Sequence, residues 1–256
     1  MPFPGNSKVS LLLLKQVAML KNLISITVLT ATVVFFSNPS FAQELGKDKE
    51  GFVAIFNGKD LADWEYNPEI WSVEDGCLVG QSPGGKPYDK QDYIYWAKAE
   101  PGDFVLKLKY RLTGKGSNSG VQIRSEKRPN WDCYGYQADM EEAPNWTGCL
   151  FHHARGAVVK RGFKGIVTFD GTDETKQFAD PAELAKKYTT EGKWNEYEIS
   201  AVGSVITLKI NDELMCEVDD QHKEAAKKGL IAFQMHPGPP MKVEFKDIKI
   251  KILDKK

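Results

Sequence analysis

Two carboxyl side chains and one amide have the spacing of one strand face, and the two carboxyl groups could do acid–base chemistry. Gln137, Asp139 and Glu141 alternate with apolar residues over positions 134–141, so a strand there would project all three from the same side. Residues two positions apart on a strand stand about 6.5 to 7 Å apart at Cα, which suits two carboxyl groups acting on a glycosidic bond. A solvated acidic strand has the same pattern, and the motif by itself leaves both interpretations open.

Two other segments place polar side chains opposite a core-facing set. Gln122 and Arg124 share one predicted strand face, and Gln234 and His236 share another. Arg124 could hold a substrate oxygen or form a structural ion pair. His236 could be a general base near neutral pH, a ligand, or a hydrogen-bonded histidine at a sheet edge. We take Arg124, Gln137 and Gln234 as candidate substrate-binding residues and His236 as a candidate catalytic residue.

Further candidates cluster in the middle of the chain. His152 and His153 are adjacent, and Arg155 follows them. Adjacent residues of a strand point to opposite faces, so at most one of the two imidazoles serves a given site. Trp131 and Trp146 could stack on a sugar ring, and packing in the core or at its rim is the alternative. Arg155 and both tryptophans are candidate substrate-binding residues.

Cofactor motifs are weak in this sequence. A divalent metal bound by Asp139, His152 and His236 is conceivable, but no short ligand spacing requires one, and we predict neither a metal nor another cofactor. The sequence has no glycine-rich phosphate loop and no Gly-x-Ser-x-Gly elbow. Dinucleotide-dependent enzymes and serine hydrolases are therefore disfavoured.

The elements that must position these side chains are mostly short strands. Residues 104–112 alternate between apolar and basic residues, and after residue 50 most other segments are short apolar runs separated by turns. The apolar parity changes at Asp247, which predicts a bulge. One short helix is expected, with Asp180 as its cap and Pro181 at its first position. The pattern predicts an all-β sandwich of two antiparallel sheets with one short helix, in a single domain over residues 52–253.

The first 42 residues differ from the rest. They contain three lysines and no acid, and from Met19 they show the order of a secretory signal: Lys21, an apolar run over 23–36 and Ser40-Phe41-Ala42 as a cleavage site. The run of about 14 residues is short for a membrane span, although an uncleaved anchor remains the alternative. We predict a signal peptide at 1–42, with Met19 as an alternative start, a short extension at 43–51, and a periplasmic or extracellular protein that leaves the membrane after cleavage.

Charge and cysteine content narrow the class further. Lys and Arg number 34 against 35 Asp and Glu, for a net charge of −1, and no basic cluster indicates a nucleic-acid partner. The four cysteines show no Cys-x-x-Cys spacing, which disfavours a zinc knuckle. A Cys133–Cys149 disulfide and buried free thiols both fit an exported chain.

Six short motifs follow one another in order along the chain. They are FNGKDLADW at 56–64, WSVEDG at 71–76, NSGVQIR at 118–124, GYQAD at 135–139, WNEY at 194–197, and QMH at 234–236 followed by FKDI at 245–248. In this order they resemble the 3-keto-disaccharide hydrolase domain family. The resemblance covers residues from about 52 to 253.

The resemblance implies a concanavalin A-like jelly-roll fold in an exported bacterial protein. It also implies action on an oligosaccharide or glycoside oxidised at C3, with a functional link to a sugar 3-dehydrogenase. The chain departs from the family after its TG-x-L-Y-like strand, where His152 and His153 stand in place of acidic residues. The family's recurrent polar positions fall on Arg124, Gln137, Asp139, Gln234 and His236.

A ketone at C3 acidifies the C2 proton, so a base can remove that proton and expel the group at C1; addition of water then completes a net hydrolysis. This chemistry needs a base, a group that stabilises the enolate, and an acid for the leaving oxygen. A carbohydrate-binding, lectin-like module without chemistry is the alternative function. The expected roles are a base (Asp139 or His236), a clamp (Arg124 with Gln137) and an acid (Glu141, His152 or His153).

Overall fold

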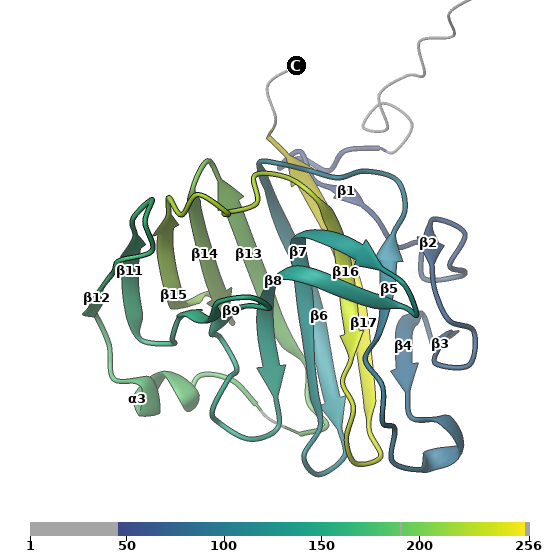
Figure 1. Cartoon of the computed structure of the whole chain (residues 1–256). Coiled ribbons are helices and arrows are strands. Elements are labelled where there is room, and N and C mark those ends of the chain that lie inside the picture. Colours follow the sequence, from purple (N-terminus) through teal and green to yellow (C-terminus); the bar gives the residue numbers. More distant parts are fainter. Residues whose placement is uncertain (1–45, 190, 254–256) are drawn as a thin grey trace, which may run out of the picture. The chain divides into compact units, whose positions relative to one another are not determined.

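The computed structural model describes residues 46–189 and 191–253, which form two β-sheets packed face to face (Figure 1). Within these residues the larger sheet has ten strands, in the order β12-β11-β15-β14-β13-β6-β17-β4-β3, with β1 also paired to β17. The strands are β1 (Val53–Ala54), β3 (Trp71–Glu74), β4 (Cys77–Gln81), β6 (Phe104–Thr113), β11 (Phe163–Val167), β12 (Asp173–Gln177), β13 (Asn195–Val202), β14 (Val205–Ile210), β15 (Glu213–Asp220) and β17 (Lys242–Ile252).

The smaller sheet has seven strands among the described residues, in the order β10-β9-β8-β7-β16-β5-β2. Pairing is antiparallel throughout this sheet, and in the larger sheet β11 and β15 run parallel. The strands are β2 (Trp64–Glu65), β5 (Asp92–Trp96), β7 (Asn118–Arg128), β8 (Asp132–Glu141), β9 (Leu150–His152), β10 (Gly156–Val159) and β16 (Leu230–Met235). A 3-10 turn, η1 (Pro83–Gly85), and a short helix, α3 (Pro181–Ala185), complete the described elements.

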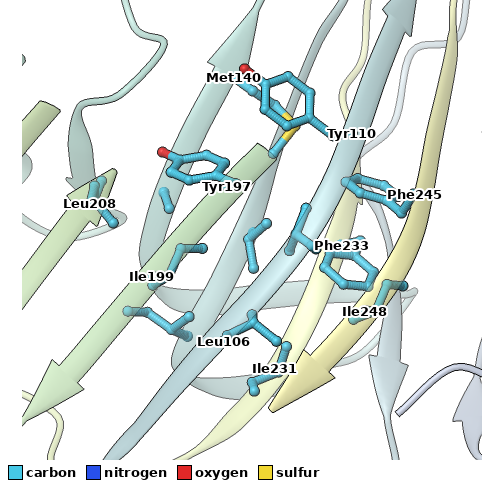
Figure 2. Packing of buried hydrophobic residues seen from close by; sticks show 14 of the residues in the cluster. Leu106, Tyr110, Met140, Tyr197, Ile199, Leu208, Ile231, Phe233, Phe245 and Ile248 are labelled. Atoms are coloured by element: carbon cyan, nitrogen blue, oxygen red, sulfur yellow. The ribbon is translucent and has the colours of Figure 1, made fainter. Parts of the chain in front are cut away.

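The hydrophobic core lies between the two sheets. On β6 every second residue is buried, so Leu106, Leu108 and Tyr110 face the core while the intervening basic residues face outward. Figure 2 shows Leu106 and Tyr110 among core residues of both sheets. Phe233 of β16 stacks on Phe245 of β17 with their ring centroids 4.4 Å apart. The two-sheet all-β fold expected from the sequence is confirmed.

Two local predictions are also confirmed. Asp180 caps α3, since its carboxylate accepts the backbone N–H of Ala182 at 2.8 Å, and Pro181 is at the first helical position. Asp247 has a φ of 53°, and the register of β17 with β6 shifts between Lys246 and Lys249. This bulge returns the next apolar residues of β17 to the core face.

The β7–β8 hairpin bends away from its own sheet and folds over the outer face of β16 and β5 (Figure 1). The bend coincides with a register shift between Ile123 and Glu126. At the hairpin tip, Tyr95 donates its hydroxyl to the carbonyl of Asp132 at 2.8 Å. A second, smaller apolar cluster fills the space beneath: Tyr93, Tyr95, Cys133, Leu230 and Ala232, with Trp131 against it. Polar residues on this outer face are therefore partly covered by the chain itself.

Other sequence predictions concern the N-terminal segment and the cysteines. The signal peptide predicted for residues 1–42 lies outside the described residues. In the part of the chain that the structure describes, no helix is long and apolar enough to cross a membrane. All four cysteines are buried free thiols, so of the two alternatives for Cys133 and Cys149 the structure has the unpaired one.

Candidate functional site

A connected group of side-chain amides lies on the outer face of the smaller sheet, with Gln137 at its centre. The Gln137 amide donates to Asp139 Oδ1 at 2.6 Å and to Gln234 Oε1 at 3.1 Å. Its oxygen accepts from Gln122 Nε2 at 2.7 Å. Gln234 in turn donates to the Tyr93 hydroxyl at 2.9 Å. Residues from β5, β7, β8 and β16 are thereby joined in one network.

The strand register explains why these side chains meet. On β7 and β8, Gln122 is opposite Gln137 and Gly120 is opposite Asp139. A Cβ atom at Gly120 would lie only 2.5 Å from the side-chain carbons of Gln137. Because Gly120 has no side chain, Gln137 can extend across β7 and reach Gln234 on the next strand. A glycine at position 120 is therefore needed for this arrangement of Gln137.

Asp139 is the titratable group at the centre of this network. It is 6% exposed, and burial raises the pKa of its carboxyl to about 8, although the hydrogen bond from Gln137 favours the ionised form and Glu141 opposes it. The donor to Asp139 is a neutral amide, so it brings no positive charge that would hold the carboxyl ionised. At neutral pH Asp139 is thus a carboxylic acid with a proton to give.

Glu141 lies two positions further along the same strand face and serves the backbone. Its Oε1 accepts the N–H groups of Asn145 at 2.7 Å and Trp146 at 2.6 Å, and its own N–H donates to Thr147 Oγ1. Its other oxygen accepts from Asn118 Nδ2 at 3.5 Å. With one carboxylate oxygen shared by two amides, Glu141 is better suited to hold a loop than to transfer a proton.

His236 follows β16 directly, two residues after Gln234. Its Nδ1 is 2.6 Å from the carbonyl oxygen of Pro237. A carbonyl only accepts hydrogen bonds, so Nδ1 carries the proton and, in the neutral ring, Nε2 carries the lone pair. The half-buried ring can therefore offer an acceptor for a proton from a ligand.

Aromatic side chains border the site on the β9 side. Phe151 is opposite Gln137 in the β8–β9 register and lies on the same outer face. Its ring is 6.1 Å from that of Trp146 and 5.9 Å from that of His153, in edge-to-face arrangements. Phe151 was not among the sequence candidates. The signal for it was its type: Phe151 is an aromatic residue on the sheet face that the alternation over residues 134–141 marks as polar.

Trp131 lies at the opposite border, at the tip of the β7–β8 hairpin. Its ring is stacked on that of Tyr95 with centroids 6.3 Å apart, and its carbonyl accepts the backbone N–H of Tyr93. The side chain thus closes the second apolar cluster. The structure separates the two candidate tryptophans, with Trp131 beside β5 and Trp146 beside β9.

The structure does not bring Arg124 to this site, and the alternation that placed it on the face of Gln122 is wrong there. Arg124 has a φ of 47° in the bend of the hairpin, which breaks the two-residue period. Its guanidinium donates to the carbonyls of Gly102 and Gly203, both at 2.8 Å, and pairs with Asp103 at 3.1 Å. Arg124 thus connects turns of the larger sheet to the hairpin.

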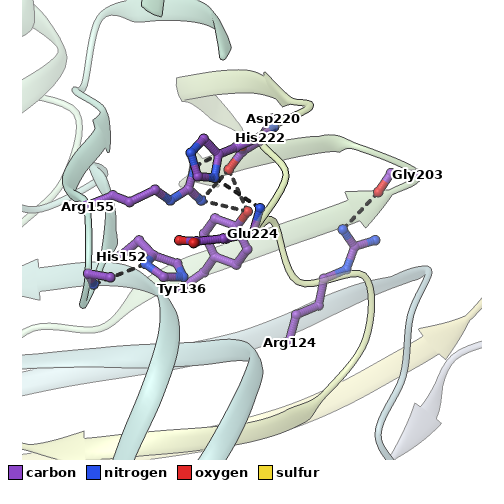
Figure 3. A network of polar contacts seen from close by, with 9 residues as sticks. Arg124, Tyr136, His152, Arg155, Gly203, Asp220, His222 and Glu224 are labelled. Atoms are coloured by element: carbon purple, nitrogen blue, oxygen red, sulfur yellow. Dashed lines mark hydrogen bonds and ion pairs between the residues drawn. The ribbon is translucent and has the colours of Figure 1, made fainter. Parts of the chain in front are cut away.

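His152 and Arg155 lie on the other side of β8 and β9, in a network that joins the two sheets (Figure 3). Arg155 donates to both oxygens of Asp220, at 2.5 and 3.1 Å, and to the Tyr136 hydroxyl at 2.9 Å. His152 packs edge-on against Tyr136, and burial lowers its pKa to about 4. Neither His152 nor Arg155 reaches Gln137 or Asp139. The structure therefore does not support the catalytic role predicted for His152 or the substrate-binding role predicted for Arg155.

No group of three or more His, Cys, Asp or Glu side chains among residues 46–189 and 191–253 is arranged to hold a metal ion. A hollow of about 670 Å³ lies on the outer face of the larger sheet. Its lysines are already paired with acids, for example Lys107 with Glu198 at 3.3 Å and Lys109 with Asp247 at 3.1 Å. Such mutually neutralised, exposed charges are typical of a solvated strand face.

Comparison with protein families supports the resemblance seen in the sequence. The sequence profile of a family described as the 3-keto-alpha-glucoside-1,2-lyase-like domain matches residues 51–251. The chain is also 31% identical over 86 residues to a 3-keto-disaccharide hydrolase of Bacteroides thetaiotaomicron. That alignment covers 30% of this chain and 29% of the relative, so the chain matches less than a third of the relative's length.

Two solved structures share the fold. A candidate glycosyl hydrolase of Parabacteroides distasonis has a TM-score of 0.54 at 21% identity, over 79% of this chain and 99% of that one. A carbohydrate-binding module from Bacillus subtilis has a TM-score of 0.50 at 14% identity, over 75% of this chain and 96% of that one. At these identities the likeness establishes the fold alone, and it confirms the jelly-roll class predicted from the sequence.

Proposed function

Since the chain belongs to the 3-keto-alpha-glucoside-1,2-lyase-like domain family, we propose that it is a carbohydrate-active enzyme that cleaves glycosides oxidised at C3. The observation that carries this proposal is the buried Asp139, whose raised pKa keeps a proton available at neutral pH. Expulsion of a sugar's C1 oxygen needs such an acid. The fold is shared with binding modules and does not support an enzyme by itself.

The proposed reaction begins with removal of the C2 proton by a base, which leaves an enolate across C2 and C3. Collapse of the enolate restores the C3 ketone, forms a C1–C2 double bond and breaks the bond from C1 to the leaving oxygen. That oxygen takes a proton from the acid and departs as an alcohol. Water then adds across the double bond, so the net change is hydrolysis of one glycosidic bond.

The site supports an acid and a base on either side of such a sugar. Asp139 is suited to protonate the leaving oxygen, and the Nε2 atom of His236 is suited to take the C2 proton. Strands β8 and β16 are separated by β7, so residues on them stand roughly 10 Å apart at Cα, which leaves room for a sugar between the side chains. Gln122 and Gln234 are buried, and their amides hold Gln137, the donor to Asp139, in place.

The test is turnover of a 3-keto-glucoside and of its unoxidised parent by the purified protein, each with and without a chelator. We expect release of the leaving group from the keto compound only, with the chelator without effect. Asp139→Asn should lower turnover by about a hundredfold or more, as loss of a general acid does. Glu174→Gln, on the exposed strand β12, is the matched carboxylate control. Turnover by Asp139→Asn at the wild-type rate would refute the assignment.

A lectin-like module is the second candidate, favoured by the aromatic residue Trp146, which is 37% exposed and contacts Phe151, the residue opposite Gln137. A module of that kind would bind one of the two sugars and release no product. Binding without cleavage in the same experiment would therefore replace the enzyme proposal with this one.

The cellular setting is part of the proposal. A ketone at C3 of a sugar arises by oxidation of a secondary alcohol, so we propose that a sugar 3-dehydrogenase supplies the substrate. The signal peptide predicted at residues 1–42 would place the encounter outside the cytoplasm. Fractionation of cells that express the full chain would test this, with a cytoplasmic location as the contradicting result.

A further inference from the structure

Two buried charged side chains both support one surface loop. The β8–β9 loop, residues 142–149, is held from one side by Glu141, 8% exposed, which accepts the N–H groups of Asn145 and Trp146. From the other side Arg161, 6% exposed, donates to the carbonyl of Thr147 and to that of Pro144 at 2.7 Å. Hydrogen bonds to charged groups are stronger than neutral ones, so this loop is held firmly in one conformation.

The residue that this loop presents is Trp146. Trp146 is 37% exposed, although its backbone is fixed by Glu141 on one side and by the turn from Trp146 O to Cys149 N at 2.8 Å on the other. The ring stands edge-to-face with Phe151, which stands edge-to-face with His153. A large apolar ring that is both exposed and fixed in place is suited to stack against the flat face of another ring.

The position of Trp146, Phe151 and His153 indicates which end of the substrate they would meet. Phe151 is opposite Gln137 on the neighbouring strand, one diagonal step from Asp139. Gln234 and His236 lie on the other side of Asp139, beyond Gly120. A sugar whose leaving oxygen faces Asp139 and whose ring lies toward Gln234 therefore directs its leaving group toward Trp146.

We propose that Trp146, Phe151 and His153 form a stacking subsite for the leaving group, and that Glu141 and Arg161 are positioning residues for Trp146. The inference rests on the proposed function and names its substrate class. The substrates are 3-keto-glycosides whose leaving group is itself a ring, either a second pyranose with an apolar face or an aromatic alcohol. Glu141 then contributes through Trp146 and transfers no proton.

The test compares three substrates: the 3-keto forms of a methyl glucoside, an aryl glucoside and a disaccharide. We expect Trp146→Ala to lower kcat/KM for the two ring-bearing substrates about tenfold relative to the methyl compound, mainly through KM, as loss of one stacking contact does. Trp146→Phe should recover part of the loss. Phe169→Ala removes an aromatic side chain that is 69% exposed elsewhere and serves as the control. Equal losses on all three substrates would overturn the proposal.

Glu141→Gln distinguishes positioning from catalysis. A positioning role predicts a rise in KM for ring-bearing substrates, and it predicts that the double variant with Trp146→Ala is no worse than Trp146→Ala alone. A catalytic role predicts a fall in kcat on all three substrates, and this result would overturn the positioning assignment.

Binding separates this inference from the proposed function. Titration with the unoxidised aryl glucoside, followed by tryptophan fluorescence or ligand-observed NMR, should show binding that Trp146→Ala weakens about tenfold and Phe169→Ala leaves unchanged. If this holds while no keto sugar is cleaved, the stacking subsite stands and the enzyme proposal fails. If keto sugars are cleaved but neither binding nor turnover depends on Trp146, the enzyme proposal stands and the subsite fails.

Discussion

The side-chain amide of Gln137 lies 2.6 Å from a carboxyl oxygen of Asp139, and both residues are 6% exposed. A neutral donor in a buried place gives the carboxyl a partner without giving it an opposite charge. Burial therefore decides the protonation state and raises the pKa of Asp139 to about 8. Hydrogen bonding and burial together produce an acid that is oriented and still protonated at neutral pH.

The raised pKa makes folding stability depend on pH. The folded state keeps the Asp139 proton up to a pH of about 8, while the unfolded chain releases it above the ordinary value of 3.8. Between these values the folded state binds one proton more, so the free energy of unfolding should fall by about 1.4 kcal/mol for each pH unit as pH rises. Urea denaturation of the wild type and of Asp139→Asn across this range measures it. The variant should lack this part of the slope, and parallel curves would contradict the protonated state.

Gly120→Ala should damage the site without unfolding the protein. The added Cβ would meet the side-chain carbons of Gln137 at 2.5 Å and push that side chain off Asp139 and Gln234. We expect turnover to fall about tenfold or more, because a misplaced catalytic group is costly, and the melting temperature to fall as well, because buried hydrogen bonds of Gln137 are lost. In a Gln137→Ala background the same glycine change should cost little more. Additive losses in the double variant would show that Gly120 acts in another way.

Arg124→Met separates a structural role from a substrate clamp. The guanidinium holds Gly102, Asp103 and Gly203, so its loss should lower the free energy of unfolding by roughly 3 kcal/mol. KM for the keto sugar should not change at a temperature where the variant is folded. A raised KM with unchanged stability would restore the clamp that the sequence suggested.

Asp220→Asn tests the network that joins the two sheets. Burial alone would raise the pKa of Asp220, but the hydrogen bonds from Arg155 and Tyr136 outweigh it and hold that pKa below its ordinary value. Loss of a buried partner leaves Arg155 uncompensated and should cost roughly 3 to 5 kcal/mol. Glu217→Gln in the exposed pair with Lys164 is the control and should cost less than about 1 kcal/mol. Similar melting temperatures for the two variants would contradict a structural role for the network.

The Asp220–Arg155 pair makes folding stability depend on pH with a sign opposite to that of Asp139. Because the folded-state pKa of Asp220 is lowered, its contribution to stability is present above the ordinary value of 3.8 and is lost as pH falls toward the folded pKa. Wild type should therefore lose stability in acid more steeply than Asp220→Asn. Acid denaturation of the two proteins, followed by circular dichroism, measures the difference, and coincident curves would refute it.

Sequence patterns could predict the structural features that depend only on residues close together in the chain. Alternation placed Gln137, Asp139 and Glu141 on one strand face, because the period of two is a local property of an extended chain. The cap at Asp180 and the bulge at Asp247 were predictable for the same reason. Because His152 and His153 are adjacent, the sequence predicted that they lie on opposite faces of a strand. It did not predict which of the two lies on the face of the amides.

Tertiary structure decided the rest, because the deciding contacts join distant parts of the chain. The bend at Arg124 depends on the hairpin folding over β5, and it reverses the face on which the guanidinium lies. The pKa of Asp139 depends on burial beneath side chains from other strands, and the side of the sheet occupied by His152 follows from its pairing with Tyr136. Residue order thus determined the fold class, the family and the set of polar side chains. Packing determined which of them are protonated, which hold the sheets together and which gather on the outer face of the smaller sheet.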